Sequence, residues 1–213
     1  MYKLSIIAMI MMFAPTLAFS SEISDPEAVF QEMFKAYEKL KDYKVQFEYV
    51  ERKGKKDEVR VCDFWFMKPD YQRLKVLKGE DAGSSVAYNP TKNRKRVAVK
   101  QGFIPVPGGL AKDDERLEGF FDSSWKSDMD EIYRLTRGGI PRLAGSEKLG
   151  DRTAYIMEFT RNKEDYTKIK VWIDKKDFLL LQYEYYKSGE FNSRKTWGNI
   201  VVDSGLRPDD FKP

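Results

Sequence analysis

Two residues of the sequence are spaced for covalent catalysis. Ser123 and Lys126 match S-x-x-K, in which a lysine one helical turn from a serine can accept the proton of the hydroxyl. The motifs that accompany this pair in serine acyltransferases are missing, because residues 195–197 read K-T-W instead of K-T-G and residues 127–129 read S-D-M instead of S-D-N. Two fixed positions in four recur often by chance, so a hydrolase is the weakest interpretation of this sequence.

The sequence lacks the residues that a metal site or thiol chemistry would require. The 213 residues include no histidine and one cysteine, which excludes an internal disulfide, a thiolate zinc site and an iron–sulfur cluster. Cys62 lies within a predicted strand, where a buried and inert thiol is expected. Asp128, Asp130 and Glu131 offer oxygen ligands, but they lack the spacing and the glycine of an EF-hand loop. We therefore predict no catalytic residue, no metal site and no cofactor, and a protein that is not an enzyme.

The charge of the chain limits its partners. Lys and Arg number 38 against 34 Asp and Glu, a net charge of +4, which is far from the basic excess of a nucleic-acid binder. A local basic cluster, Lys92–Arg96, falls on a predicted hairpin turn. It has two interpretations, a solvated turn or a contact with anionic lipid or another acidic partner.

The first twenty residues have the pattern of a cleaved signal peptide. Lys3 precedes an apolar run over residues 4–13, and Ala18 and Ser20 supply the small residues of a cleavage site. The run is too short for a membrane span, and Pro15 interrupts it. We predict a signal peptide over 1–20, export to the periplasm and a mature chain that does not span a membrane.

The remaining residues, 21–213, read as a single α+β domain that is mainly antiparallel β. Residues 24–27 (SDPE) predict a helix start, and an apolar stripe at helical spacing follows to Leu40. Alternating apolar residues and short turns then predict strands at 44–49, 58–67, 71–77, 85–88, 96–99, 155–160, 168–174, 179–186 and 193–202. Between the two groups of strands, residues 102–110 predict a loop, and residues 113–121 and 128–135 predict short helices.

The apolar face of this sheet exceeds what one long amphipathic helix can cover. Aromatic residues make up 14% of the chain, and many alternate with polar residues along the predicted strands. A curved sheet with an incomplete helical cover leaves a cavity, which would suit acyl chains. A fully packed core is the alternative, and composition alone does not decide between the two.

Several short motifs resemble the LolA-type outer-membrane lipoprotein carriers. Residues 63–70 (DFWFMKPD), followed by Arg73-Leu74, are similar to the strand and turn of that family. Residues 170–174 (KVWID) and the closing segment 203–213, in which a Phe precedes a final Pro, are similar as well. The chain is identified as a divergent member of this superfamily. The resemblance implies an unclosed half-barrel sheet with an N-terminal helix and a helical or loop insertion that acts as a lid over a hydrophobic cavity.

The family resemblance and the strand pattern together define a candidate site. In the family an arginine just before the proline of the strand turn holds the lid through hydrogen bonds, and Lys68 occupies that position here, so Lys68 is the predicted lid contact. The predicted lipid-binding residues come from the helix face, the strands and the loop: Phe30, Phe34, Tyr37, Val45, Phe47, Tyr49, Trp65, Leu74, Phe103, Ile104, Tyr155, Met157, Phe159, Val171, Leu181 and Tyr183.

The resemblance implies a periplasmic carrier that binds the acyl chains of lipoproteins or lipids and moves them between envelope membranes or to an exporter. Its expected partners are those acyl chains and an inner-membrane exporter or an outer-membrane acceptor, with the carrier itself a monomer. The alternative is a non-enzymatic envelope sensor of the RseB type, which contacts a membrane-protein partner.

Overall fold

The computed structural model describes residues 24–102, 104–117, 119–137, 139–160 and 167–213. The predicted signal peptide and Phe103 lie outside these residues. Within them, no helix is both long enough and apolar enough to cross a membrane.

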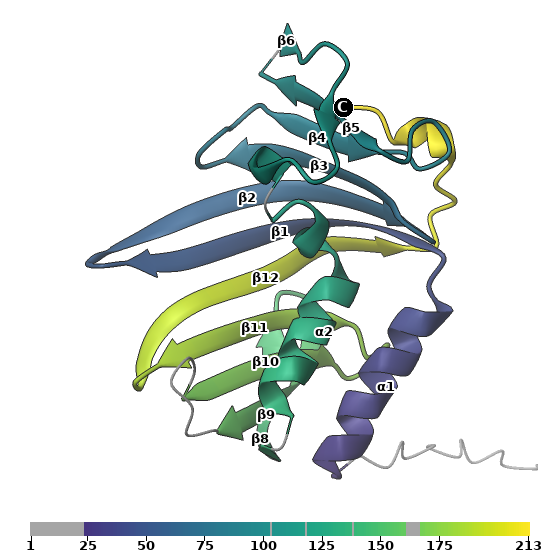
Figure 1. Cartoon of the computed structure of the whole chain (residues 1–213). Coiled ribbons are helices and arrows are strands. Elements are labelled where there is room, and N and C mark those ends of the chain that lie inside the picture. The colour runs from purple at the N-terminus through teal and green to yellow at the C-terminus, as the bar shows by residue number, and fades with distance from the viewer. Residues whose placement is uncertain (1–23, 103, 118, 138, 161–166) are drawn as a thin grey trace, which may run out of the picture.

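One large antiparallel sheet forms the body of the molecule (Figure 1). Its strands are β1 (Asp42–Lys53), β2 (Lys56–Met67), β3 (Tyr71–Lys78), β4 (Ser85–Tyr88), β5 (Arg96–Gln101), β6 (Ile104–Pro105), β7 (Leu110–Ala111), β8 (Ile140–Leu149), β9 (Arg152–Thr160), β10 (Lys168–Asp174), β11 (Leu180–Lys187) and β12 (Glu190–Val202). The spatial order is β6-β5-β4-β3-β2-β1-β12-β11-β10-β9-β8, with β7 paired to β5. Because β6 and β8 lie at opposite edges, the sheet is unclosed, which confirms the predicted half-barrel class.

The strand order explains where the middle of the chain must run. The first group of strands extends outward from β1 and the second outward from β12, and these two strands pair at the centre. The segment that joins β5 to β8, residues 102–139, must therefore pass from one edge of the sheet to the other. We call this segment the insertion. It crosses the face on which the helices lie (Figure 1).

Two helices cover that face. Helix α1 (Pro26–Lys39) begins where the Asp25 carboxylate accepts a hydrogen bond of 3.0 Å from the Glu27 amide, with Pro26 in the first turn. Helix α2 (Trp125–Thr136) lies in the insertion, after two short 3-10 turns, η1 (Glu115–Leu117) and η2 (Phe121–Ser123). The Ser124 hydroxyl caps α2, and the Trp125 amide donates to the Tyr43 hydroxyl of β1 at 2.9 Å, which fixes the start of α2 over the sheet.

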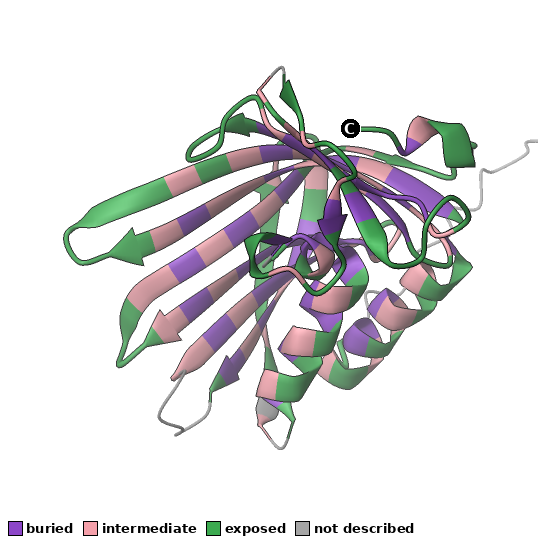
Figure 2. Ribbon diagram, turned by 45° about the horizontal axis from the view of Figure 1, so that its top comes forward, coloured by how far each residue is buried: buried purple, intermediate pink, exposed green. Residues whose placement is uncertain are grey.

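Buried residues alternate with less buried ones along the long strands (Figure 2). The principal core lies on the helix-covered face and joins α1 and α2 to both groups of strands. On the outer face, the C-terminal segment with η3 (Pro208–Asp210) folds back over the strands, where Leu206 and Phe211 pack with Tyr71. The Asp42 carboxylate holds this segment because it accepts hydrogen bonds from the amides of residues 204–206, at 2.8 to 3.3 Å.

The structure corrects the predicted elements at three places. Strand β8 was not predicted, because it is largely exposed and Gly145 interrupts its pattern where a bulge shifts the register. The predicted helix over 113–121 is two 3-10 turns, and the predicted loop over 102–110 contains the short strands β6 and β7.

Candidate functional site

A cavity of about 950 Å³ lies between the first group of strands and the insertion. This volume is at the upper end of the range of roughly 300–1,000 Å³ that is typical of ligand pockets. The apolar residues that line it are Phe47, Cys62, Leu74, Val76, Val86, Val99, Val106, Leu110, Leu117 and Phe120. Most of these are buried core residues, so the cavity is a gap within the principal core.

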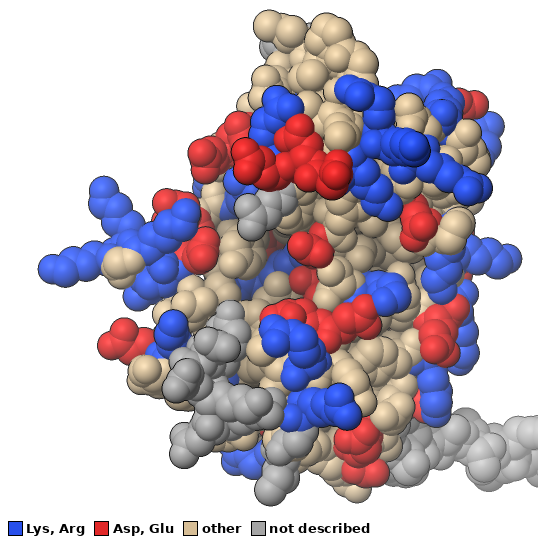
Figure 3. Space-filling view, viewed as in Figure 1, with Lys and Arg blue, Asp and Glu red and all other residues tan. Residues whose placement is uncertain are grey.

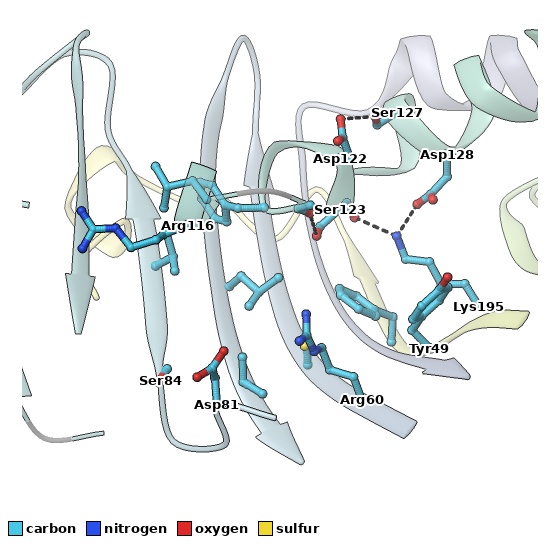
Figure 4. A pocket seen from close by; sticks show the side chains of 18 of the residues that line it. Tyr49, Arg60, Asp81, Ser84, Arg116, Asp122, Ser123, Ser127, Asp128 and Lys195 are labelled. Atoms are coloured by element: carbon cyan, nitrogen blue, oxygen red, sulfur yellow. Dashed lines mark hydrogen bonds and ion pairs between the residues drawn. The ribbon is translucent and has the colours of Figure 1, made fainter. Parts of the chain in front are cut away.

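One wall of the cavity carries a buried ion pair. Lys195 Nζ on β12 lies 2.6 Å from the Asp128 carboxylate in the first turn of α2, and the two side chains are 6% and 7% exposed. The same ammonium donates to the Ser123 carbonyl at 3.4 Å and lies 4.6 Å from the ring centre of Phe47 (Figure 4). The Tyr183 hydroxyl donates to the other Asp128 oxygen at 3.0 Å. The hydrogen bonds of this network join the insertion to β11 and β12.

Burial shifts the pKa values of two groups on this wall, the Asp128 carboxyl and the Tyr183 hydroxyl. Removal from water raises the pKa of the Asp128 carboxyl, and the adjacent Lys195 opposes that shift. The pKa of the Tyr183 hydroxyl is raised well above its usual range by burial and by the neighbouring Asp128 charge. Since the Tyr183 hydroxyl keeps its proton, it remains the donor in its bond to Asp128.

Charged side chains of both signs surround the opening, and the face is hollowed between them (Figure 3). Arg116 pairs with Asp114 at 2.7 Å. Arg134 pairs with Glu131, and Lys126 with Asp130, along the outer side of α2. The site thus combines an apolar interior with a charged rim.

Four of the predicted lipid-binding residues line the cavity: Phe47, Tyr49, Leu74 and Tyr183. Another eight lie in or against the principal core without lining the cavity: Phe30, Phe34, Tyr37, Val45, Tyr155, Met157, Phe159 and Val171. For the four residues on β9 and β10, the reason is that α1 and α2 cover these strands with side chains. The rings of Phe30 and Phe159, for example, are 5.4 Å apart.

Two predicted lining residues, Trp65 and Leu181, lie on the opposite face of the sheet, and their prediction is corrected. Phe64 is in register with Leu74 and shares its face, so the adjacent Trp65 points outward and packs under the C-terminal segment. Leu181 packs with Ala154 and other outer-face residues, because a register shift between β10 and β11 occurs beside it.

The loop and lid predictions have mixed outcomes. Ile104 is 74% exposed and does not contact the cavity, whereas Val106 and Leu110 of the same segment line it. Lys68 donates to the carbonyls of Tyr37 at 3.1 Å and Glu38 at 2.8 Å, so it holds the last turn of α1.

The other candidate residues have structural partners. The Ser123 hydroxyl donates to the Gly119 carbonyl at 2.7 Å, while Lys126 points outward to Asp130, so the S-x-x-K pair is not assembled. No group of three or more metal-ligating side chains occurs among the residues that the structure describes. Burial raises the pKa of the Cys62 thiol to about 11. In the basic cluster, Arg96 donates to the carbonyls of Gly108 and Gly109.

Sequence reasoning missed part of the cavity wall. Val76 could have been found, because it follows Leu74 by two residues and shares its face. The period-two spacing of Ser193, Lys195 and Trp197 puts all three on the same face of β12, and all three are buried. A lysine is ordinarily exposed, and its acidic partner is distant in sequence, so its burial was not expected.

No protein-family model matches the chain, and no curated protein matches its sequence. Solved structures do match. Lipoprotein LppX of Mycobacterium tuberculosis is similar at a TM-score of 0.53 with 12% identity, over 87% of this chain and 100% of that chain. The Pseudomonas aeruginosa MucA/MucB complex is similar at a TM-score of 0.54 with 13% identity, over 89% of this chain and 61% of the matched chain.

A LolA superfamily protein from Nitrosomonas europaea also matches, at a TM-score of 0.39 with 10% identity, over 88% of this chain and 97% of that chain. At these identities the comparisons concern the fold alone. The likeness to LppX and to the MucA/MucB complex agrees with the fold described above, an unclosed antiparallel sheet with a helical insertion.

Proposed function

We propose that this protein is a periplasmic carrier that binds the acyl chain of a lipid or lipoprotein in the cavity. It would move that ligand between envelope membranes or to an exporter, without catalysing a reaction. The observation that carries the proposal is the cavity itself, which has an apolar interior, a volume of about 950 Å³ and a rim of charged side chains.

The chemistry of the cavity suits an amphiphile. Each buried methylene of an acyl chain contributes about 0.8 kcal/mol, so a chain of moderate length is held firmly against water. The same chain is released to any site that offers equal apolar contact, as transfer requires. The charged rim would leave a polar headgroup near water.

The sensor alternative has less support. The likeness to a chain of the MucA/MucB complex is one of fold, and the matched segment spans 61% of that chain. The cavity, by contrast, is a property of this chain.

The first test asks whether the purified protein holds a lipid. Mass spectrometry of an organic extract of the native protein is expected to detect a bound acyl compound, and a fluorescent fatty acid is expected to bind after delipidation. Absence of any extracted lipid, together with no binding of the probe, would overturn the proposal.

A matched pair of variants locates the ligand. Val76 and Leu77 are neighbours on β3, but Val76 lines the cavity and Leu77 is exposed on the other face. Val76→Trp fills the cavity and should lower the affinity for the probe at least about tenfold, while Leu77→Trp should leave it unchanged. Val86→Trp is a second filling variant in case Val76→Trp does not fold. Equal binding by a folded filling variant and by Leu77→Trp would place the ligand elsewhere.

A further inference from the structure

Most of the charged side chains that line the cavity form an ion pair or a hydrogen bond with a neighbouring side chain. Asp128 pairs with Lys195, Arg116 with Asp114, Arg134 with Glu131 and Asp130 with Lys126, while Asp122 accepts a hydrogen bond from Ser127 at 3.3 Å. Within the described part of the chain, two cavity-lining charges, Arg60 and Asp81, have no side-chain hydrogen bond or ion pair. They carry opposite signs and are not paired with each other.

The fold brings these two residues to one side of the opening. Arg60 is on β2, and Asp81 is in the turn between β3 and β4 (Figure 4). Gly79 lets this turn approach β2 closely, because a Cβ at Gly79 would lie 2.7 Å from the Val59 carbonyl and 3.2 Å from Arg60 Cα. Both Arg60 and Asp81 are exposed, so they stand where a ligand would meet water.

We infer that Arg60 and Asp81 bind the headgroup of a zwitterionic amphiphile whose acyl chain occupies the cavity. This inference rests on the proposed function. The guanidinium fits a phosphate, to which it can donate two parallel hydrogen bonds, and the carboxylate fits an ammonium group. A purely anionic headgroup would meet repulsion from Asp81, and a purely cationic one from Arg60, so the pair selects a headgroup that carries both charges.

The test compares three amphiphiles with the same chain, each below its critical micelle concentration. Dodecylphosphocholine carries both charges, dodecyl phosphate is anionic, and dodecyltrimethylammonium is cationic. Titration calorimetry on the delipidated protein should show the tightest binding for dodecylphosphocholine. Each charge should contribute about three- to fivefold, as exposed ion pairs do, and raising the salt concentration should reduce the preference.

Two variants should change the preference in opposite directions. Arg60→Gln should weaken dodecylphosphocholine binding about three- to fivefold and strengthen binding of the cationic amphiphile. Asp81→Asn should weaken dodecylphosphocholine binding similarly and strengthen binding of the anionic one. Asparagine suits this position because Asp81 has a positive φ of 62°. Lys78→Gln and Glu80→Gln are the matched controls, since they remove neighbouring charges that do not line the cavity.

The outcomes separate this inference from the proposed function. Equal affinity for all three amphiphiles, or equal effects of the control variants, would overturn the headgroup site while the acyl-chain site stands. Free phosphocholine serves as a fourth ligand. If it bound as tightly as dodecylphosphocholine, the headgroup site would be supported and the acyl-chain proposal would be overturned.

Discussion

The two halves of the sheet carry similar apolar faces but are covered differently. Over β8–β10, the side chains of α1 and α2 fill the space, and none of the described residues of these strands lines the cavity. Over β2–β5, the cover is the irregular first part of the insertion, with short strands and 3-10 turns, and a gap of about 950 Å³ remains. We call these the filled half and the hollow half.

The cover of the sheet, more than the sheet itself, creates the cavity. A regular helix presents a continuous row of side chains that can interdigitate with a sheet face. The insertion between Gly102 and Ser124 contains several Gly and Pro residues, and the residues of this stretch that the structure describes form no α-helix. It therefore spans the hollow half without filling it.

The largest expected effect is at the boundary between the halves. Lys195→Met should lower the free energy of unfolding by about 3–5 kcal/mol, because Asp128 would remain buried without its cation. Loss of the ammonium also removes the group that lowers the pKa of Asp128, so the carboxyl would titrate further above its usual range. Since the folded variant then binds a proton more readily than the unfolded chain, its stability should rise as the pH falls through that raised pKa toward the ordinary value of 3.8.

Urea denaturation at several pH values would check this prediction. The double variant Asp128→Leu with Lys195→Met should regain most of the loss, because it leaves neither charge of this pair buried without its partner. A single-variant loss below about 1 kcal/mol would show that the pair is not buried in solution.

The next effect compares two equally buried rings. Phe159 in the filled half and Phe120 in the hollow half are each 5% exposed. Phe159→Ala should destabilise the protein by about 3–5 kcal/mol, and Phe120→Ala by about 1–2 kcal/mol less, since Phe120 already borders open space. Equal losses in denaturant unfolding would break the distinction between the halves.

Thiol reactivity should distinguish the halves as well. The pKa of Cys62 is raised from 9.0 to about 11, so at pH 8 its thiolate fraction, and its alkylation by iodoacetamide, should be about 100-fold below those of an unperturbed thiol. Because the cavity gives access to Cys62, this residue should still react faster than Val171→Cys in a Cys62→Ser background. Mass spectrometry follows both reactions, and the reverse order would contradict the assignment of the hollow half.

The smallest effect concerns the outer face of the filled half. Glu158 pairs with Arg142 and with Lys170 at 3.2 Å, and these bonds lower the pKa of Glu158. The pairs contribute stability above the ordinary pKa of 4.5, and the contribution is lost as the pH falls through the lower pKa of the folded state. Glu158→Gln should therefore cost less than about 1 kcal/mol at pH 7 and nothing in acid, with probe binding unchanged. A loss that persisted in acid would point to packing instead.

Local patterns were sufficient for most elements of the fold. The cap at Asp25 and the alternation along β3 predicted a helix start and a strand close to those observed, whereas the strand predicted at 44–49 covers only the middle of β1. Strand β8 was not predicted, because an exposed strand with a bulge at Gly145 lacks a regular alternation of apolar residues. The face of Trp65 was not predictable from its neighbours, since Phe64 and Phe66 are also apolar and the local sequence has no alternation.

The amino-acid sequence was sufficient to predict a mainly antiparallel α+β domain with surplus apolar surface, because both follow from periodicities over a few residues. The half-barrel form of the sheet was implied by the family resemblance. Only the tertiary structure decided where that surface stays open. The order of strands sends the insertion from edge to edge and brings Asp128 to Lys195 across 67 residues. The close approach of Gly79 to β2 places the turn that carries Asp81 near the strand that carries Arg60. These contacts depend on how distant segments of the chain pack, so the spacing of residues within one segment does not predict them.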